Sequence, residues 1–261
     1  MKIQPLKTND VSVKGSSKVL VYAHHGAGKT TQAANYHDRY GKGLVISGES
    51  GLSSIADREI DYLPFTTFDR PAKNGYSFKD IVGYVSSEDF KSEGYKWICI
   101  DSATELSQRC FADVEAELSG SSNGFEKWGL YERKITAALK WVRDLPMHVL
   151  ITSLAAEESD DNGVVNFWPM LVQKKVQKLV PALYDHVFCL VRKTTDNNGK
   201  MDVRRYIITE QVHGWHGKSR DPHRRLSAIE NTDDVTKLLE RIYMTEQEYS
   251  NYLSKGPKDD V

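Results

Sequence analysis

Short apolar runs alternate along the chain with longer segments in which apolar residues recur every three or four positions. The runs at 98–100 and 149–151 are continuously apolar, which is typical of strands covered by helices on both faces. This alternation predicts an α/β fold with a mainly parallel central sheet flanked by helices. Strands are predicted at 18–23, 43–47, 97–101, 148–153, 186–192 and 202–209, and helices at 29–39, 78–90, 103–118, 127–145 and 172–179.

The C-terminal part departs from this alternation. The strand predicted at 202–209 follows the turn sequence Asp-Asn-Asn-Gly at 196–199, which favours an antiparallel hairpin with the strand before it. Short helices are predicted at 233–243 and 245–253. The polar end, 254–261, is expected to fray.

Composition sets limits on this arrangement. With 261 residues, 39% of them hydrophobic, the chain suits one globular unit, a core at 1–225 with a helical extension and tail at 226–261 that is not a separate domain. No apolar run approaches the roughly 20 residues of a membrane span, and the first residues lack the apolar stretch of a signal peptide. Three cysteines without a CxxC spacing indicate reduced thiols. We therefore expect a cytoplasmic protein without membrane contact.

The strongest chemical signal is the loop Ala-His-His-Gly-Ala-Gly-Lys-Thr-Thr at 23–31, which lies between a predicted strand and a predicted helix. Consecutive backbone N–H groups followed by a helix N-terminus form an anion site, so the sequence predicts a P-loop that binds a nucleoside triphosphate. Lys29 is expected to reach the β- and γ-phosphates. Ala23 stands where the usual pattern has its first glycine. The predicted nucleotide-binding residues of the loop are His25, Gly26, Ala27, Gly28, Lys29, Thr30 and Thr31.

A predicted buried strand ends at Asp101. Downstream of a P-loop, a carboxylate in this position holds the shell of a Mg²⁺ ion through water, and the Thr30 hydroxyl coordinates the same ion. Thr30 and Asp101 are therefore the predicted metal-site residues. The alternative is an aspartate that only caps the helix predicted at 103–118.

Residue 102 is serine, whereas many motor ATPases carry their water-activating glutamate there. Glu49 is the main candidate for this role, because it follows the strand at 43–47 and the C-terminal ends of parallel strands open onto one ligand face. A carboxylate there can orient and deprotonate the attacking water. Glu105 is the weaker candidate, and Glu49 can also be interpreted as a solvated turn residue.

This ordered set of motifs resembles the RecA-like ATPases, and among them the phage-encoded single-strand annealing ATPases related to RadA and to KaiC-type core domains. The resemblance runs from about residue 15 to about residue 225 and includes segments at 125–129, 144–153 and 212–220. It implies a RecA-like core, ATP as the nucleotide, Mg²⁺ as its cation, and hydrolysis that depends on oligomers and on DNA. No guanine-reading Asn/Thr-Lys-x-Asp motif occurs in the sequence.

In such families a Lys-x-Arg pair reaches across a subunit interface to the γ-phosphate bound by the neighbour. The resemblance implies this catalytic role for Lys218 and Arg220, with cations that stabilise charge on the transferred phosphoryl group. Self-association would then complete each ATP site. The alternative is a basic surface loop, since Arg224 and Arg225 follow closely.

The resemblance also implies a polar sensor of the γ-phosphate at Ser153, the end of the strand predicted at 148–153. Thr152 competes for this role. A buried hydroxyl at a strand end, without any function in nucleotide binding, is the third interpretation.

RecA-like proteins bind single-stranded DNA with two loops, which by order along the chain are about 119–127 and 155–176. Because the formal net charge is −1, binding has to come from a local patch of cations. The second loop carries such side chains together with aromatic ones, Phe167, Trp168, Lys174, Lys175 and Lys178, but also four acidic ones, Glu157, Glu158, Asp160 and Asp161.

The sequence thus predicts an ATPase that assembles on single-stranded DNA for phage-type recombination or annealing, with a single-strand-binding protein as a further partner. Two other functions stay open: a regulatory or accessory ATPase that acts through a protein partner, and a small-molecule or nucleotide kinase with an arginine-rich lid. His213, His216 and His223 lack a Cys or Glu at metal-ligand spacing, which argues against a zinc site.

Overall fold

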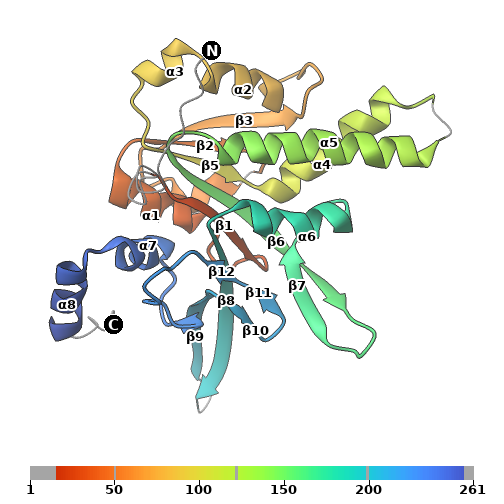
Figure 1. Ribbon diagram of the computed structural model, residues 1–261. Helices are drawn as coiled ribbons and strands as arrows, with labels where there is room; N and C mark the ends of the chain where they lie inside the picture. The colour runs from red at the N-terminus through yellow and green to blue at the C-terminus, as the bar shows by residue number, and fades with distance from the viewer. Residues whose placement is uncertain (1–15, 50, 121–122, 198–199, 256–261) are drawn as a thin grey trace, which may run out of the picture.

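The structure is a computed structural model that describes residues 16–49, 51–120, 123–197 and 200–255. A mostly parallel β-sheet forms its centre. The strands lie in the order β13-β9-β8-β1-β6-β5-β2-β3-β4 (Figure 1). Neighbours from β8 to β4 pair in parallel, whereas β9 and β13 pair antiparallel at one edge. The predicted α/β fold with a C-terminal antiparallel hairpin is therefore confirmed. The bounds are β1 Lys18–Ala23, β2 Gly43–Ser47, β3 Asp61–Thr67, β4 Tyr76–Ser77, β5 Trp97–Asp101, β6 His148–Ser159, β8 His186–Asn197, β9 Lys200–Ile208 and β13 Ile229–Glu230.

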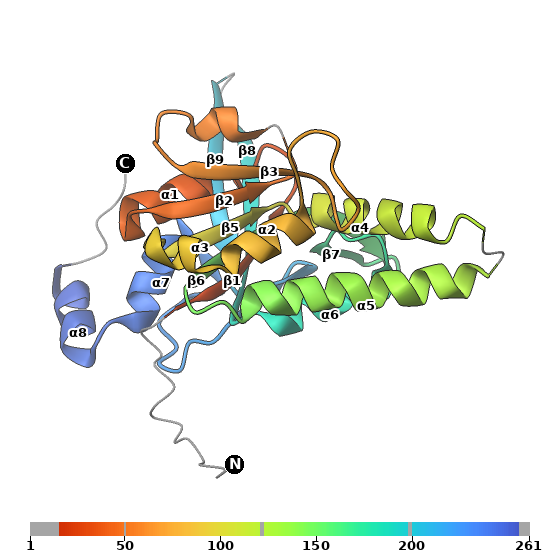
Figure 2. The same ribbon diagram turned by 90° about the horizontal axis from the view of Figure 1, so that it is seen from above.

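Helices cover both faces of the sheet (Figures 1 and 2). Helices α1 and α7 share one core with Val19 and Val21 of β1, and helices α2, α4, α5 and α6 share the other with Leu20 and Tyr22. Alternate residues of β1 thus serve two cores, and burial of each large apolar side chain contributes about 1.5–3 kcal/mol. The helices are α1 Thr31–Tyr40, α2 Phe78–Val85, α3 Glu88–Ser92, α4 Ala103–Glu117, α5 Gly124–Arg143, α6 Lys174–Leu183, α7 Val235–Tyr243 and α8 Glu246–Lys255.

Two strands extend past β1 and form hairpins beyond it (Figure 1). β6 pairs with β1 as far as Leu154 and then pairs antiparallel with β7 (Val165–Pro169). β8 pairs with β1 as far as Leu190 and then only with β9. We call residues 155–169 the β6–β7 arm and residues 191–197 together with 200–206 the β8–β9 arm. Because β6 and β8 are the two neighbours of β1, the P-loop emerges between the two arms.

Short strands tie the following segment back to the sheet. β10 (Gln211–Val212) and β11 (Trp215–His216) form a small antiparallel pair, and Trp215 also pairs with Phe167 of β7. β12 (Lys218–Ser219) pairs with the beginning of β8. The segment after the β8–β9 arm therefore runs from the C-terminal ends of the parallel strands, where the P-loop lies, back to their N-terminal ends.

Helix α7 is anchored directly to the P-loop helix. The side-chain amide of Gln32 in α1 donates to the carbonyl oxygens of Gly28 (3.2 Å) and Asp233 (2.7 Å), and its oxygen accepts from Val235 N–H (3.1 Å). One buried glutamine thus joins the P-loop to the start of α7. None of the helices in the described ranges has the length and hydropathy needed to span a bilayer.

The helix predicted at 78–90 is two helices. Ser87 lies between α2 and α3, and its hydroxyl accepts a hydrogen bond from Phe90 N–H (3.2 Å) as the N-cap of α3. A serine that caps a new helix competes with continuation of the preceding one, and the predicted single helix is therefore wrong at this point.

Candidate nucleotide-binding site

The P-loop has the predicted strand–loop–helix form. β1 ends at Ala23 and α1 begins at Thr31. Gly26 and Gly28 have φ of +70° and +100°, a region that side chains disfavour, so glycine is required for the course of the backbone. A β-carbon on Gly26 would meet nothing within 4 Å, which leaves the space beside the loop open to a phosphate. Of the other predicted loop residues, Ala27 is buried, and His25 and Thr31 are exposed.

Lys29 folds over the loop that carries it. Its ammonium donates to the carbonyl oxygens of Ala23 (3.3 Å) and His24 (3.1 Å). Burial lowers the pKa of Lys29, while the carboxylates of Glu49 and Asp101 act in the opposite direction. The lysine and these two carboxylates therefore belong to one electrostatic site.

Asp101 is buried at the end of β5 and accepts hydrogen bonds at both oxygens. Oδ2 accepts from the Thr30 hydroxyl (3.1 Å), and Oδ1 accepts from the Thr152 hydroxyl. Burial raises the pKa of Asp101, Thr152, Thr30 and Lys29 lower it, and Glu49 raises it. A hard cation at this point would favour the ionised carboxylate, and the adjoining oxygens of Thr30 and Asp101 are ligands that Mg²⁺ accepts while it keeps several waters. These residues fit the implied metal.

Glu49 is held beside this pair by Ser102, the residue that stands where many motor ATPases carry their glutamate. The Ser102 hydroxyl donates to Glu49 Oε1 and also accepts from Glu105 N–H (3.3 Å) as the N-cap of α4. The turn itself is fixed because Gly48 N–H donates to the carbonyl oxygen of Asp101 (3.0 Å) and Glu49 N–H donates to the Ser47 hydroxyl (3.2 Å). The N-cap of α4 is therefore Ser102, and the alternative in which Asp101 caps this helix is wrong. The sequence assigned Ser102 no role in the site.

Glu105 lies close to the same turn but is engaged elsewhere. A β-carbon on Gly48 would come within 2.5 Å of Glu105 Cγ. The Glu105 carboxylate forms an ion pair with Arg109 on the next turn of α4, at 2.6 Å. Its partner on α4 therefore draws this carboxylate away from the bond that Glu49 makes with Ser102.

Thr152 and Ser153 point to opposite faces of the sheet. Ile100 pairs with Ile151, so the next residues, Asp101 and Thr152, are also neighbours. The Ser153 hydroxyl instead lies 3.1 Å from the Thr104 hydroxyl and donates to the carbonyl oxygen of Leu154 (3.0 Å). Thr152, and not Ser153, touches the predicted metal residue, and the alternation of strand faces relative to Asp101 could have indicated this.

We expect Thr152→Val to raise the Mg²⁺ concentration that half-saturates ATP turnover by about tenfold, because a hydrogen bond to a carboxylate contributes about 1.5–3 kcal/mol. The loss also raises the pKa of Asp101, so the defect should shrink as pH rises. Magnesium titrations of turnover at two pH values measure both effects. Ser153→Ala is the matched control, and a larger defect in that variant would assign the sensor role to Ser153 instead.

Lys218 and Arg220 lie near the N-terminal ends of the parallel strands, whereas the P-loop lies at the C-terminal ends. β12 pairs Lys218 with Val187, at the beginning of β8, whereas the P-loop follows the end of β1. The six residues of β1 separate the N-terminal and C-terminal ends of the strands by roughly 15–20 Å, at about 3.3 Å per residue. Within one chain the structure therefore does not bring these cations to Lys29.

The two cations differ in how they are held. The Lys218 ammonium donates to the carbonyl oxygens of Pro181 (3.2 Å) and Tyr184 (2.8 Å), at the C-terminal end of α6, and burial lowers its pKa. The Arg220 guanidinium makes an ion pair with Asp185 at 3.0 Å, and its side chain is 71% exposed. Lys218 thus fixes the end of a helix, and Arg220 is the available cation.

The loop histidine His24 connects the P-loop to the β6–β7 arm. Its ring makes edge contacts with Phe167 and Trp215, at centroid distances of 5.5 and 5.4 Å, and Nε2 lies 3.7 Å from Glu157. The Tyr22 hydroxyl donates to the carbonyl oxygen of Phe167 at 3.0 Å. Phe167 of this arm and Trp215 of β11 therefore pack against His24 of the P-loop.

The other candidate residues are dispersed. Within the described ranges no three His, Cys, Asp or Glu side chains form a metal cluster, and His216 and His223 contact Asn166 and Glu246 respectively. The loop predicted at 119–127 is wrong beyond residue 123, because α5 begins at Gly124. Residues 121–122 lie outside the described residues, and Phe125 in the first turn of α5 is 89% exposed.

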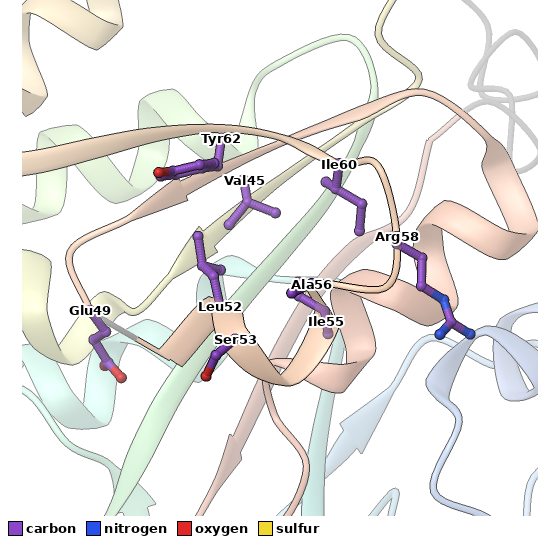
Figure 3. A pocket seen from close by; sticks show the side chains of 9 residues that line it. All are labelled: Val45, Glu49, Leu52, Ser53, Ile55, Ala56, Arg58, Ile60 and Tyr62. Atoms are coloured by element: carbon purple, nitrogen blue, oxygen red, sulfur yellow. The ribbon is translucent and has the colours of Figure 1, made fainter.

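A surface pocket of about 470 Å³ adjoins the site on the side of β2 and β3. Figure 3 shows Glu49 at one end of the pocket and Arg58 at the other, with mainly apolar side chains between them. The pocket includes residues of a 3-10 helix (Gly51–Ile55) that follows the Glu49 turn. Its lining residues are Val45, Glu49, Leu52, Ser53, Ile55, Ala56, Arg58, Ile60 and Tyr62.

Comparison with protein families gives one match, to the family described as an AAA domain, over residues 16–221. The chain belongs to this AAA domain family. It is a P-loop ATPase of this family, whose phosphate loop lies between β1 and α1 of a mostly parallel sheet. No curated protein matches this AAA domain in sequence.

Three of the solved structures that resemble the chain share little sequence with it. A KaiC-like protein from the archaeon Pyrococcus horikoshii OT3 has 14% identity and a TM-score of 0.42, over 74% of this chain and 79% of that one. The RadB recombinase has 9% identity and a TM-score of 0.41, over 74% and 80%. The flagellar accessory protein FlaH from Methanocaldococcus jannaschii has 8% identity and a TM-score of 0.38, over 77% and 83%.

Proposed function

We propose that this AAA domain hydrolyses ATP in head-to-tail assemblies on single-stranded DNA, for recombination or annealing of the phage type. In these assemblies Arg220 of one copy completes the ATP site of the next. The observation that carries the proposal is the position of Arg220, exposed at the edge of the sheet opposite the P-loop. A cation at that position cannot reach the nucleotide bound by the same chain. A heterologous contact between copies would bring Arg220 of one copy next to the P-loop of another.

The surroundings of Arg220 suit such a contact. It borders an open cleft of about 490 Å³ whose lining includes Lys18, Arg143 and Asp185. The ion pair with Asp185 is exposed enough to exchange partners at little cost, since surface pairs contribute about 0–1 kcal/mol. A neighbour's γ-phosphate is a stronger partner for a guanidinium than one partly solvated carboxylate.

Each residue of the ATP site then has a separate role in hydrolysis. Bound MgATP supplies the electrophilic γ-phosphoryl group. Lys29 and the P-loop would fix the phosphates of bound ATP, and Thr30 and Asp101 would hold the cation. Glu49, oriented by Ser102, takes the proton of the water that attacks the γ-phosphorus, while the bond to the bridging oxygen breaks and ADP leaves. The partner subunit's Arg220 stabilises the charge that develops during transfer. An assembly is therefore needed for turnover, and a strand of DNA that aligns copies accelerates it.

The first test measures ATP turnover across protein concentrations, with and without a long unstructured single-stranded DNA. We expect the turnover per protomer to rise with protein concentration and to rise further with DNA, since both fill the interface that holds Arg220. A turnover per protomer that is indifferent to both would overturn the proposal and favour an accessory ATPase that acts through a protein partner.

Arg220→Ala is expected to retain ATP binding and to lose about 10³-fold or more in turnover, the size of effect known for an arginine supplied in trans. Mixing Arg220→Ala with Lys29→Ala should restore part of the activity, because the first variant keeps its P-loop and the second keeps its arginine. Steady-state turnover of the mixture, against each variant alone, measures this. Recovery is specific to an arginine that acts between copies.

Arg224→Ala removes an exposed cation four residues away and serves as the matched control. Normal turnover of Arg220→Ala at every protein concentration would contradict the role in trans. Equal losses in both variants would indicate a general contribution of basic charge.

The kinase alternative needs an arginine lid over the P-loop, but Arg225 is buried and donates to carbonyl oxygens at the end of α7.

A further inference from the structure

The β8–β9 arm carries a charge arrangement that the ATP site does not use. Arg192 pairs across the arm with Arg205, and the adjacent pair is Lys193 with Arg204. All four side chains are exposed. Like charges directly opposite each other destabilise an antiparallel pair, so the arm by itself gains nothing from these two pairs.

Acidic neighbours neutralise only part of this charge. Arg204 makes an ion pair with Asp202 (2.9 Å), and Arg205 lies 3.8 Å from Asp233. For Arg192 and Lys193, no ion pair occurs among the residues that the structure describes. From 191 to 206 the sequence has five lysines and arginines against two aspartates, in a chain of formal net charge −1. The arm is therefore a local basic patch on a near-neutral protein.

The cations are distributed over both faces of the arm. Successive strand residues point to opposite faces, so the pair Arg192–Arg205 lies on one face and the pair Lys193–Arg204 on the other. The next residues along β8, Thr194 and Thr195, are exposed and add a hydroxyl to each face. Guanidinium and hydroxyl groups are the usual donors to phosphate oxygens, and three of the four cations are arginines.

We propose that the β8–β9 arm binds the sugar–phosphate backbone of single-stranded nucleic acid, a proposal that rests on the function proposed above. The closely spaced negative charges of a phosphate backbone can neutralise a pair of cations that repel each other, such as Arg192 and Arg205. Because the P-loop emerges beside the arm, a bound strand lies at the edge of the sheet that carries the ATP site. The β6–β7 arm is less suited to this contact, since its Glu158 already pairs with Lys174 (3.5 Å) and Lys178 (3.6 Å).

Two other occupants fit the arm less well. The β6–β7 arm of a second copy is a poor acidic partner, because its Glu157 and Glu158 already contact a histidine and lysines of their own chain. A membrane surface would need apolar anchors, and the large apolar side chains exposed on the β8–β9 arm are Met201 and Val203 alone among those described.

The test uses the full chain with the double variant Arg192→Gln/Arg205→Gln. Binding of a fluorescent oligothymidine is followed by anisotropy in a non-hydrolysable ATP analogue, between about 50 and 200 mM salt. We expect affinity to fall by about tenfold or more at the lower salt, and the slope of log affinity against log salt to decrease by about 1.4, since each phosphate contact on a single strand contributes about 0.7. The loss should be equal for oligothymidine and oligocytidine, because phosphate contacts carry no sequence information.

The double variant Lys79→Gln/Lys91→Gln is the matched control, because it removes the same charge from exposed residues of α2 and α3. Arg192→Lys/Arg205→Lys, which keeps the charge, should retain most of the affinity. Unchanged affinity and slope in the glutamine variant would overturn the role of the arm and leave assembly on DNA intact. Failure of the wild-type protein to bind either oligonucleotide would overturn both proposals. Loss of self-association by the glutamine variant without DNA would assign the arm to the subunit interface and overturn its nucleic-acid role.

Discussion

Lys29→Ala is expected to abolish measurable ATP turnover and to weaken ATP binding by about a hundredfold or more. The lysine would make charge-assisted bonds to two phosphates, each of which contributes about 1.5–3 kcal/mol. Its loss also removes a cation that interacts with Glu49 and Asp101, so that the negative charge of these carboxylates opposes the approach of a polyanion. Titration with a fluorescent ATP analogue measures binding, and phosphate release measures turnover.

Lys73→Ala, which removes an exposed lysine from a loop outside the site, is the control for this variant. Equal melting temperatures of the three proteins would show that the variant is folded. ATP affinity and turnover at the wild-type level in Lys29→Ala would refute the assignment of residues 23–31 as a phosphate loop.

The elements around the P-loop could be predicted because they are buried and regular. The predicted bounds of β1, β2 and β5 coincide with those in the structure, since each strand is covered on both faces and reads as a continuous apolar run. β3 was missed for the opposite reason. It lies near the edge of the sheet, most of its side chains are not buried, and Pro64 interrupts the strand pattern.

The site itself could be predicted only in part. Glu49, Asp101 and Lys29 meet because parallel strands end at one edge, and that rule can be applied to a sequence. The bond from Ser102 to Glu49 could not be predicted, since it depends on the path of the turn after β2 and on the side-chain conformation of an N-cap. The β8–β9 hairpin was predicted, but the opposition of Arg192 and Arg205 was not, because it depends on the register of strands that are longer than their apolar parts.

Glu49→Gln is the variant that separates binding from chemistry. The amide oxygen can still accept the hydrogen bond from Ser102, so the turn and the P-loop should keep their conformation. An amide does not take a proton from water, and loss of a general base typically costs about 10²–10⁴-fold in rate. We therefore expect ATP affinity within about twofold of wild type and turnover reduced by that factor, measured by analogue titration and by single-turnover hydrolysis.

Glu105→Gln is the matched comparison, because its carboxylate lies near the same turn but is paired with Arg109. We expect little change in its turnover. If Glu49→Gln hydrolyses ATP at the normal rate and Glu105→Gln does not, the general base is on α4, and the bond between Ser102 and Glu49 only shapes the turn. If Glu49→Gln accumulates assemblies with unhydrolysed ATP, the γ-phosphate is what joins the copies, because the variant retains both Lys29 and the partner subunit's Arg220.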